Sequence, residues 1–128
     1  MIGRELQFAA EVLINDLRKT QKGEIVAITG DTASDMSFIA AVGRAAAMAG
    51  AKPLIVLIPT PSGVSLAADK DIQVEGLSGL LAHADIWIEL NVKWLLYSTP
   101  FYRAKKANPS LRHMCLTGTT ADTLIRCV

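Results

Sequence analysis

Polar residues that could do chemistry follow several short apolar runs of this chain. Two such stretches, residues 29–32 (TGDT) and 117–120 (TGTT), place a glycine and hydroxyl groups ahead of a helical pattern. Free N–H groups at a helix amino terminus favour an anion. The candidate anion-binding residues are Gly30, Thr32, Gly118, Thr119 and Thr120. Helix capping is the interpretation we favour, since each stretch leads into a Thr-x-x-Asp pattern and no GxGxxG or GxxxxGK[ST] motif is present.

Carboxylates and an amide follow two of the same apolar runs. Asp31 and Thr32 come after the first run, and Glu89 and Asn91 come after a later one, so these four are candidates for lining a substrate cleft. A strand covered on both faces should not bury an unpaired carboxylate. We expect Glu89 to reach water at the end of its strand, with pairing, for example to Lys93, as the alternative.

No set of residues forms a recognisable catalytic centre. His83 and His113 lack a second ligand at metal spacing, and Ser98 has no GxSxG context and no nearby histidine and acid. We therefore assign no catalytic residue, no metal ligand and no bound cofactor to this chain. Four aromatic residues follow the third apolar run and predict a pocket lining, a docking surface for a partner domain, or ordinary packing of a helix on a sheet: Trp94, Tyr97, Phe101 and Tyr102.

The elements that position these residues alternate regularly along the chain. Short β-branched runs predict strands, and apolar residues at helical spacing predict helices between them. The predicted strands are 24–29, 53–58, 86–90 and 111–116, and the predicted helices are 4–20, 35–49, 75–84, 97–107 and one from Thr120 onward, with a long connection over 59–75. This order predicts an α/β three-layer sandwich, Rossmann-like or flavodoxin-like, with a four-stranded parallel sheet in the order 2-1-3-4 and an additional N-terminal helix.

Composition limits the classes of partner. Hydrophobic residues make up 51% and charged residues 20%, which indicates one globular domain over residues 1–128, and no apolar run has the length of a membrane span. The net charge is +1, so we expect neither nucleic acid nor a membrane as a partner. No secretory signal is visible, and we expect a cytoplasmic protein with both cysteines, Cys115 and Cys127, buried as thiols.

Five segments together resemble a known family: GEIVAITGDTASD, AGAKPLIVLIPTP, HADIWIEL, WLLYSTPFYRAKKA and LRHMCLTGTTADTLIRCV. Their order is similar to the amino-terminal domain of the thermophilic (aminopeptidase T-like) metallopeptidases, a domain shared with the 2,5-dihydroxypyridine dioxygenase group. The resemblance implies a longer protein whose metal ligands, for zinc, cobalt or iron, lie in a carboxyl-terminal catalytic domain. It also implies a homo-oligomer.

For the loop after the third strand, the resemblance implies a part in enclosing substrate by Tyr97, Ser98, Thr99 and Tyr102. This loop reads Tyr-Ser-Thr where the family has a Ser-His-Thr type of pattern. The chain also stops on an apolar pair, Cys127–Val128, two turns into a predicted helix, so we expect more protein to follow it.

The resulting hypothesis is a scaffold and substrate-cleft domain of an aminopeptidase-like metalloenzyme, inactive by itself. The alternatives are the equivalent domain of a ring-cleaving dioxygenase, or a free-standing flavodoxin-like module that binds a small anion or nucleotide.

Overall fold

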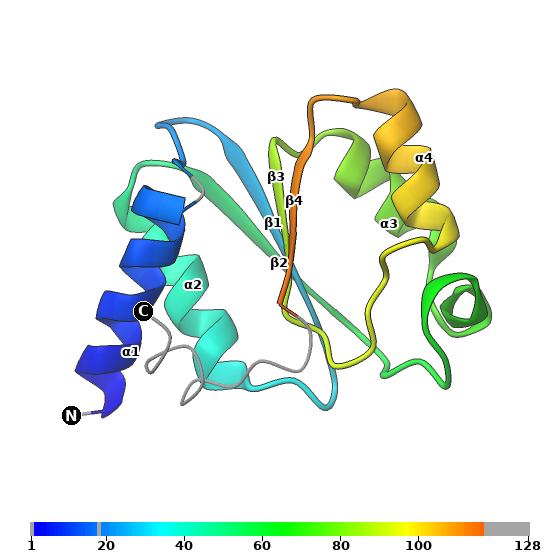
Figure 1. Cartoon of the computed structure of the whole chain (residues 1–128), viewed down its shortest axis with the longest axis horizontal. Coiled ribbons are helices and arrows are strands. Elements are labelled where there is room, and N and C mark those ends of the chain that lie inside the picture. Colours follow the sequence, from blue (N-terminus) through cyan, green and yellow to red (C-terminus); the bar gives the residue numbers. More distant parts are fainter. Residues whose placement is uncertain (1, 18, 117–128) are drawn as a thin grey trace.

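The protein is a three-layer sandwich with one parallel sheet at its centre (Figure 1). The computed structural model describes residues 2–17 and 19–116. Its strands are β1 (Ile25–Asp31), β2 (Lys52–Ile58), β3 (Ile86–Glu89) and β4 (Arg112–Cys115), and its α-helices are α1 (Ile2–Val12), α2 (Met36–Met48), α3 (Val74–Ala82) and α4 (Thr99–Ala107). All neighbouring strands pair in parallel, in the order β2-β1-β3-β4. The predicted fold class and strand order are therefore confirmed.

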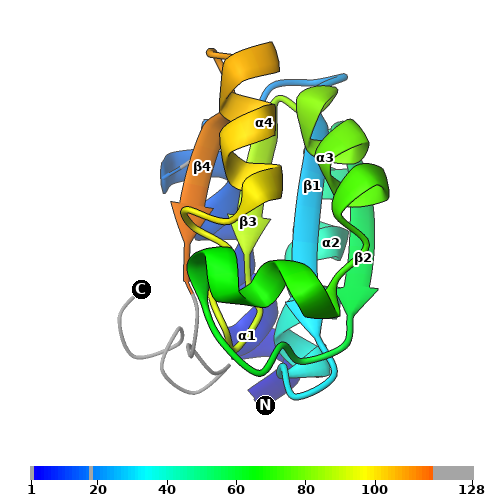
Figure 2. The ribbon, with the colours of Figure 1, turned by 90° about the vertical axis from the view of Figure 1, so that its right-hand side faces the viewer.

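Helices cover both faces of the sheet, because the two central strands are apolar on both sides. Helices α1 and α2 lie on one face, and α3 and α4 lie on the other (Figures 1 and 2). Strand β3 is buried at all four positions, and β1 is buried at every position after Ile25. Such continuous burial is the expected property of strands in a parallel sheet.

Close approach of α2 to the sheet depends on small residues. A Cβ atom added to Gly30 of β1 would lie 2.4 Å from Cδ1 of Ile39, and one added to Gly43 of α2 would lie 2.9 Å from Cδ1 of Ile55. The alanines of α2 serve the same purpose, and Ala41, Ala45 and Ala46 are all buried. On the opposite face the core is built around Trp87, which is fully buried.

Several predicted boundaries differ from the structure. The first helix ends as an α-helix at Val12 and continues as the π-helix η1 (Leu13–Leu17), and the connection predicted over 59–75 contains a 3-10 helix, η2 (Ser65–Asp71). Strand β1 runs on to Asp31 because Gly30 and Asp31 pair with Leu57 and Ile58 of β2.

Two local predictions were wrong, and others lie outside the described residues. The cap of α2 is Asp35, whose carboxylate accepts from the N–H groups of Ser37 and Phe38, and not Thr32. Cys115 is exposed, because it lies on the outermost described strand of its side of the sheet. The residues not described include the predicted last helix and Gly118, Thr119, Thr120 and Cys127. Within the described part, the helices are all too short or too polar to cross a bilayer.

Candidate functional site

The loops after β1 and β3 meet beyond the carboxyl-terminal ends of the parallel strands, where ligands of open α/β sheets bind. Three polar side chains in this region, those of Asp31, Glu89 and Asn91, belong to residues that are 0% exposed. A buried carboxylate is costly unless hydrogen bonds satisfy it. The partners of these three groups therefore define what the site can do.

Glu89 is a buried, fully engaged carboxylate. Its Oε1 atom accepts from the N–H of Leu95 at 2.5 Å and from Nδ2 of Asn91 at 3.0 Å. Its Oε2 atom lies 2.7 Å from Nε2 of His113, whose side chain is 9% exposed. The expectation that Glu89 reaches water was wrong, because β4 places His113 beside it and the following loop folds back over it. His113, and not Lys93, is the side chain that pairs with Glu89.

A hydrogen-bond chain extends this pair across the sheet. The Thr29 hydroxyl donates to Oδ1 of Asn91 at 2.8 Å and accepts from Nε1 of Trp87 at 3.0 Å. The Trp87 ring stacks on His113, with ring centroids 4.1 Å apart and an angle of 12° between the planes. The imidazole is thus held by an acid at its edge and an indole on its face. These contacts link β1, β3 and β4 through side chains.

Asp31 ties two loops together. Its Oδ2 atom accepts from the N–H groups of Val92 and Lys93, at 2.7 and 3.2 Å, and its Oδ1 atom accepts from the N–H of Ala33 at 3.0 Å. Ser34 adds a bond from its hydroxyl to the carbonyl of Leu90 at 2.9 Å. Asp31 therefore holds the loop after β3 against the loop after β1.

The start of α4 is anchored by the residues that the family resemblance singled out. Ser98 is buried and caps the helix by accepting from the N–H of Phe101 at 3.4 Å. The N–H of Thr99 donates to Oδ1 of Asp69 at 3.0 Å, and its hydroxyl donates to Oδ2 of the same carboxylate. Tyr97, just before the cap, has a φ of 69°. A residue with a side chain is strained in this left-handed region.

The aromatic residues form a graded cluster from the surface to the core. The Phe101 ring lies 6.4 Å from the buried Trp87 ring, between centroids, and packs edge-on against Tyr97 and Tyr102. The two tyrosines are each 52% exposed. Phe101 therefore packs the helix on the sheet, as one of the two interpretations predicted, and a pocket lined by Tyr97 and Tyr102 stays a prediction. Trp94 stands apart and donates from Nε1 to the Ser65 hydroxyl at 3.3 Å.

At the candidate anion site the polar groups already have partners. The Thr32 and Thr60 hydroxyls lie 2.9 Å apart, and Thr60 also accepts from the N–H of Ala33 at 3.1 Å. The carboxylate of Asp35 occupies the amino terminus of α2. A negative charge at this position opposes a second anion. Gly30 lies under α2 within β1, where it serves packing.

The buried polar side chains of this site all have protein partners. Among residues 2–17 and 19–116 no three histidine, cysteine, aspartate or glutamate side chains gather at metal-binding distance. The oxygens of Asp31 accept hydrogen bonds from backbone N–H groups, and the side chains of Glu89 and His113 bond to each other. These side chains therefore do not fit the ligand set of a divalent metal. The site consists of loops after β1 and β3 that hydrogen bonds hold together, with the half-exposed rings of Tyr97 and Tyr102 before and within α4.

Comparison with known proteins gives structural matches. Neither a family model nor a curated protein matches the chain. Among solved structures, it is similar to 2,5-dihydroxypyridine dioxygenase from Pseudomonas putida KT2440, with a TM-score of 0.68 and 20% identity over 90% of this chain. It is also similar to wild-type AmpT from Thermus thermophilus, with a TM-score of 0.51 and 17% identity over 99% of this chain. What they share with this chain is the fold.

The match covers only a part of each of those proteins. This chain spans 34% of the dioxygenase and 42% of AmpT, and it corresponds to their amino-terminal part. The structural match thus supports the resemblance noted in the sequence.

The Glu89–His113 pair is the feature that sequence reasoning missed. Trp87 and Glu89 lie on the same face of β3, because side chains alternate between the faces along a strand, and Trp87 is in register with His113 on β4. Alternation along β3 was visible in the sequence, but the register that brings His113 to Glu89 was not.

Proposed function

We propose that this chain is the scaffold and substrate-cleft domain of an aminopeptidase-like metalloenzyme whose metal site lies outside residues 1–128. The observation that carries the proposal is the fold match to AmpT, which takes in 99% of this chain and 42% of the other protein. A domain that makes up a minor part of a longer enzyme contributes to substrate binding through its surface. The surface best suited to this role lies at the carboxyl-terminal ends of the strands.

Within this proposal the candidate residues take different parts. Tyr97 and Tyr102 are exposed and would contact the substrate or the facing domain. The buried groups Asp31, Glu89, Asn91 and Ser98 would position the loops that carry those rings. The partly buried Thr99 would do the same through its bonds to Asp69. Thr32 would hold the loops after β1 and β2 together through Thr60. Preorganised loops lose less conformational entropy when a ligand binds.

A second candidate is the corresponding domain of a ring-cleaving dioxygenase. The specific observation in its favour is the TM-score, which is 0.68 for the dioxygenase and 0.51 for AmpT. In both candidate functions the metal lies in a further domain, and the substrate is bound at the carboxyl-terminal ends of the strands of the present domain. They differ in the substrate that the complete enzyme would accept.

The test has two parts. The purified 128-residue chain should bind less than stoichiometric zinc, cobalt or iron(II) by elemental analysis, and should turn over neither aminoacyl-p-nitroanilides nor 2,5-dihydroxypyridine. The gene sequence beyond codon 128 should continue in frame and encode histidine and carboxylate residues at metal-ligand spacing. Stoichiometric metal with turnover by the short chain, or an immediate stop codon, would refute the proposal.

A further inference from the structure

Strand β2 has one neighbour, β1, in the described sheet, so its other edge is open. The N–H of Lys52 donates to the Glu24 carbonyl at 2.7 Å, and the N–H of Thr32 donates to the Ile58 carbonyl at 3.1 Å. Because backbone groups alternate along a strand, the even-numbered residues of β2 face β1. The outward groups are therefore the N–H and C=O of Ile55 and of Leu57, and the C=O of Pro53.

The side chains along this edge are apolar and half-exposed. Leu54, Ile55 and Leu57 are 47%, 48% and 49% exposed, and no charged residue lies between Pro53 and Ile58. Natural sheets usually protect an edge with inward-pointing charges, bulges or prolines in the middle of the strand. The proline here is Pro53, at the second position of β2, where it leaves the outward N–H groups of Ile55 and Leu57 available.

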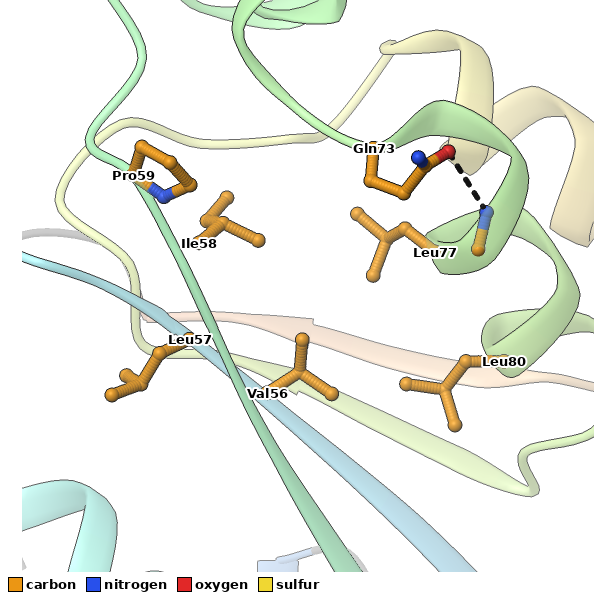
Figure 3. Close-up of a pocket in the computed structure, with 8 residues that line it drawn as sticks. Val56, Leu57, Ile58, Pro59, Gln73, Leu77 and Leu80 are labelled. Atoms are coloured by element: carbon orange, nitrogen blue, oxygen red, sulfur yellow. Dashed lines mark hydrogen bonds between the residues drawn. The ribbon is translucent and has the colours of Figure 1, made fainter.

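A small apolar hollow lies beside the edge, between β2 and α3 (Figure 3). Its volume is about 280 Å³, and Val56, Ile58, Leu77 and Leu80 line it. In the close-up, Val56 and Leu80 point toward one another, whereas Leu57 points to the other side of the strand. Apolar surface is thus available on both faces of the same strand.

We infer that this edge pairs with the same edge of a second copy of the chain. A two-fold axis relates two identical strands only in antiparallel orientation. With the axis at Val56, Ile55 of one copy faces Leu57 of the other, and each pair exchanges two N–H···O=C bonds. All four outward N–H groups then find carbonyl partners. The two four-stranded sheets join into one of eight strands.

The ends of β2 agree with this register. Pro53 of one copy faces Pro59 of the other, and neither residue has an N–H group to leave unpaired. Lys52 faces Thr60 across the pair, so the two lysines do not oppose each other. Every other residue between Leu54 and Ile58 faces an apolar one. A second copy therefore supplies an acceptor for every outward N–H group of β2 and matches this edge in polarity and in charge, independently of the proposed function. The outward carbonyls of Pro53 and Pro59 face each other without a donor and stay at the solvent-exposed ends of the pairing.

Sedimentation of the 128-residue chain over a range of concentrations tests the pairing. The chain should be a dimer, and Leu57→Lys should weaken the dimer by roughly 100-fold or more, because the interface would gain two desolvated ammonium groups. Phe8→Lys is the matched control, since Phe8 is a 65% exposed residue of α1, and it should leave the dimer intact. Circular dichroism of each variant verifies its folding. A monomeric parent chain, or a dimer that Leu57→Lys leaves unchanged, would overturn the inference and assign the edge to another occupant.

Disulfide trapping tests the register without a destabilising charge. Val56 faces Val56 of the second copy in a non-hydrogen-bonded pair, where the Cα atoms approach to about 4.5 Å. In a background carrying Cys115→Ser and Cys127→Ser, Val56→Cys should give a covalent dimer under mild oxidation. Leu54→Cys, which faces Ile58, should remain largely a monomer on a non-reducing gel. The opposite pattern would refute this register.

Discussion

Removal of the Glu89 carboxylate should destabilise the protein strongly. Glu89→Ala leaves two buried donors without an acceptor, the N–H of Leu95 and, when protonated at Nε2, the His113 ring. It also removes one of the two acceptors of Asn91 Nδ2, which keeps its bond to the Lys93 carbonyl at 2.7 Å. Each orphaned donor costs about 1–3 kcal/mol. Relaxation and the entry of water reduce the simple sum, and removing one partner of a buried pair costs about 3–5 kcal/mol. We expect a loss of unfolding free energy in this latter range.

Two comparison variants separate this effect from a general cost of losing a glutamate. Glu89→Gln keeps the shape and the Oε1 acceptor, so it should lose only about 1 kcal/mol, the usual worth of one hydrogen bond. Glu75→Ala removes an exposed pair, in which Glu75 Oε1 lies 2.7 Å from Arg103 Nη1 and the side chains are 81% and 50% exposed. An exposed pair contributes about 0–1 kcal/mol.

Urea unfolding followed by circular dichroism and by tryptophan fluorescence measures these differences. Fluorescence is informative because Trp87 stacks directly on His113, the partner of Glu89. Coincident transitions from the two probes would justify a two-state analysis. If Glu89→Ala cost no more than Glu75→Ala, the carboxylate would have to be solvated, and the buried network described here would be refuted.

Two further predictions concern charge and packing. Burial by itself raises the pKa of Glu24, but hydrogen bonds from Arg112 and from the N–H of Gln21, together with the Arg112 charge, bring that pKa below its ordinary value. The stabilisation from this ion pair is therefore present above the ordinary glutamate pKa and is lost as pH falls through the lowered pKa of Glu24. In melting curves recorded over a pH series, Glu24→Gln should lose the decrease in stability that occurs in this acidic range. An unchanged pH profile would contradict the assignment. Gly30→Ala should destabilise the protein by about 1–3 kcal/mol in the same urea denaturation assay, because the added methyl group would collide with Ile39. Gly79→Ala in α3 is the control: its methyl group would meet nothing within 4 Å, and the variant should be more stable by about 0.5–1 kcal/mol. Equal effects of the two alanines would count against close packing of α2 on β1.

The errors at the end of β1 and at the cap of α2 share one cause. Gly30 and Asp31 were interpreted as a strand break because both residue types favour turns. In the structure they continue β1, since Leu57 and Ile58 lie alongside to pair with them. Tertiary pairing thus overrode a local preference, and Thr32, predicted to cap α2, bonds to Thr60 of a neighbouring loop for the same reason.

Side-chain partners in the site could not be predicted because they are distant in the sequence. Asp31 binds the N–H of Val92, 61 positions away, and Glu89 meets His113, 24 positions away. Only strand order and register bring such groups together. The exposure of Cys115 was mispredicted for a related reason, because burial of a strand residue depends on which strand forms the edge of the sheet.

By itself, the sequence determined the alternation of helices and strands and hence a parallel sheet, because hydrophobic periodicity is a local signal and the rules that join βαβ units are few. Those rules allow more than one strand order, and the order predicted among them is confirmed by the structure. The sequence also placed Asp31, Glu89 and Asn91 at the ends of strands. The tertiary structure alone decided that these groups are buried and hold loops in place, and that β2 has an open apolar edge in the sheet of the described residues. The physical reason is that desolvation of a polar group and its compensation by a partner depend on neighbours that register supplies.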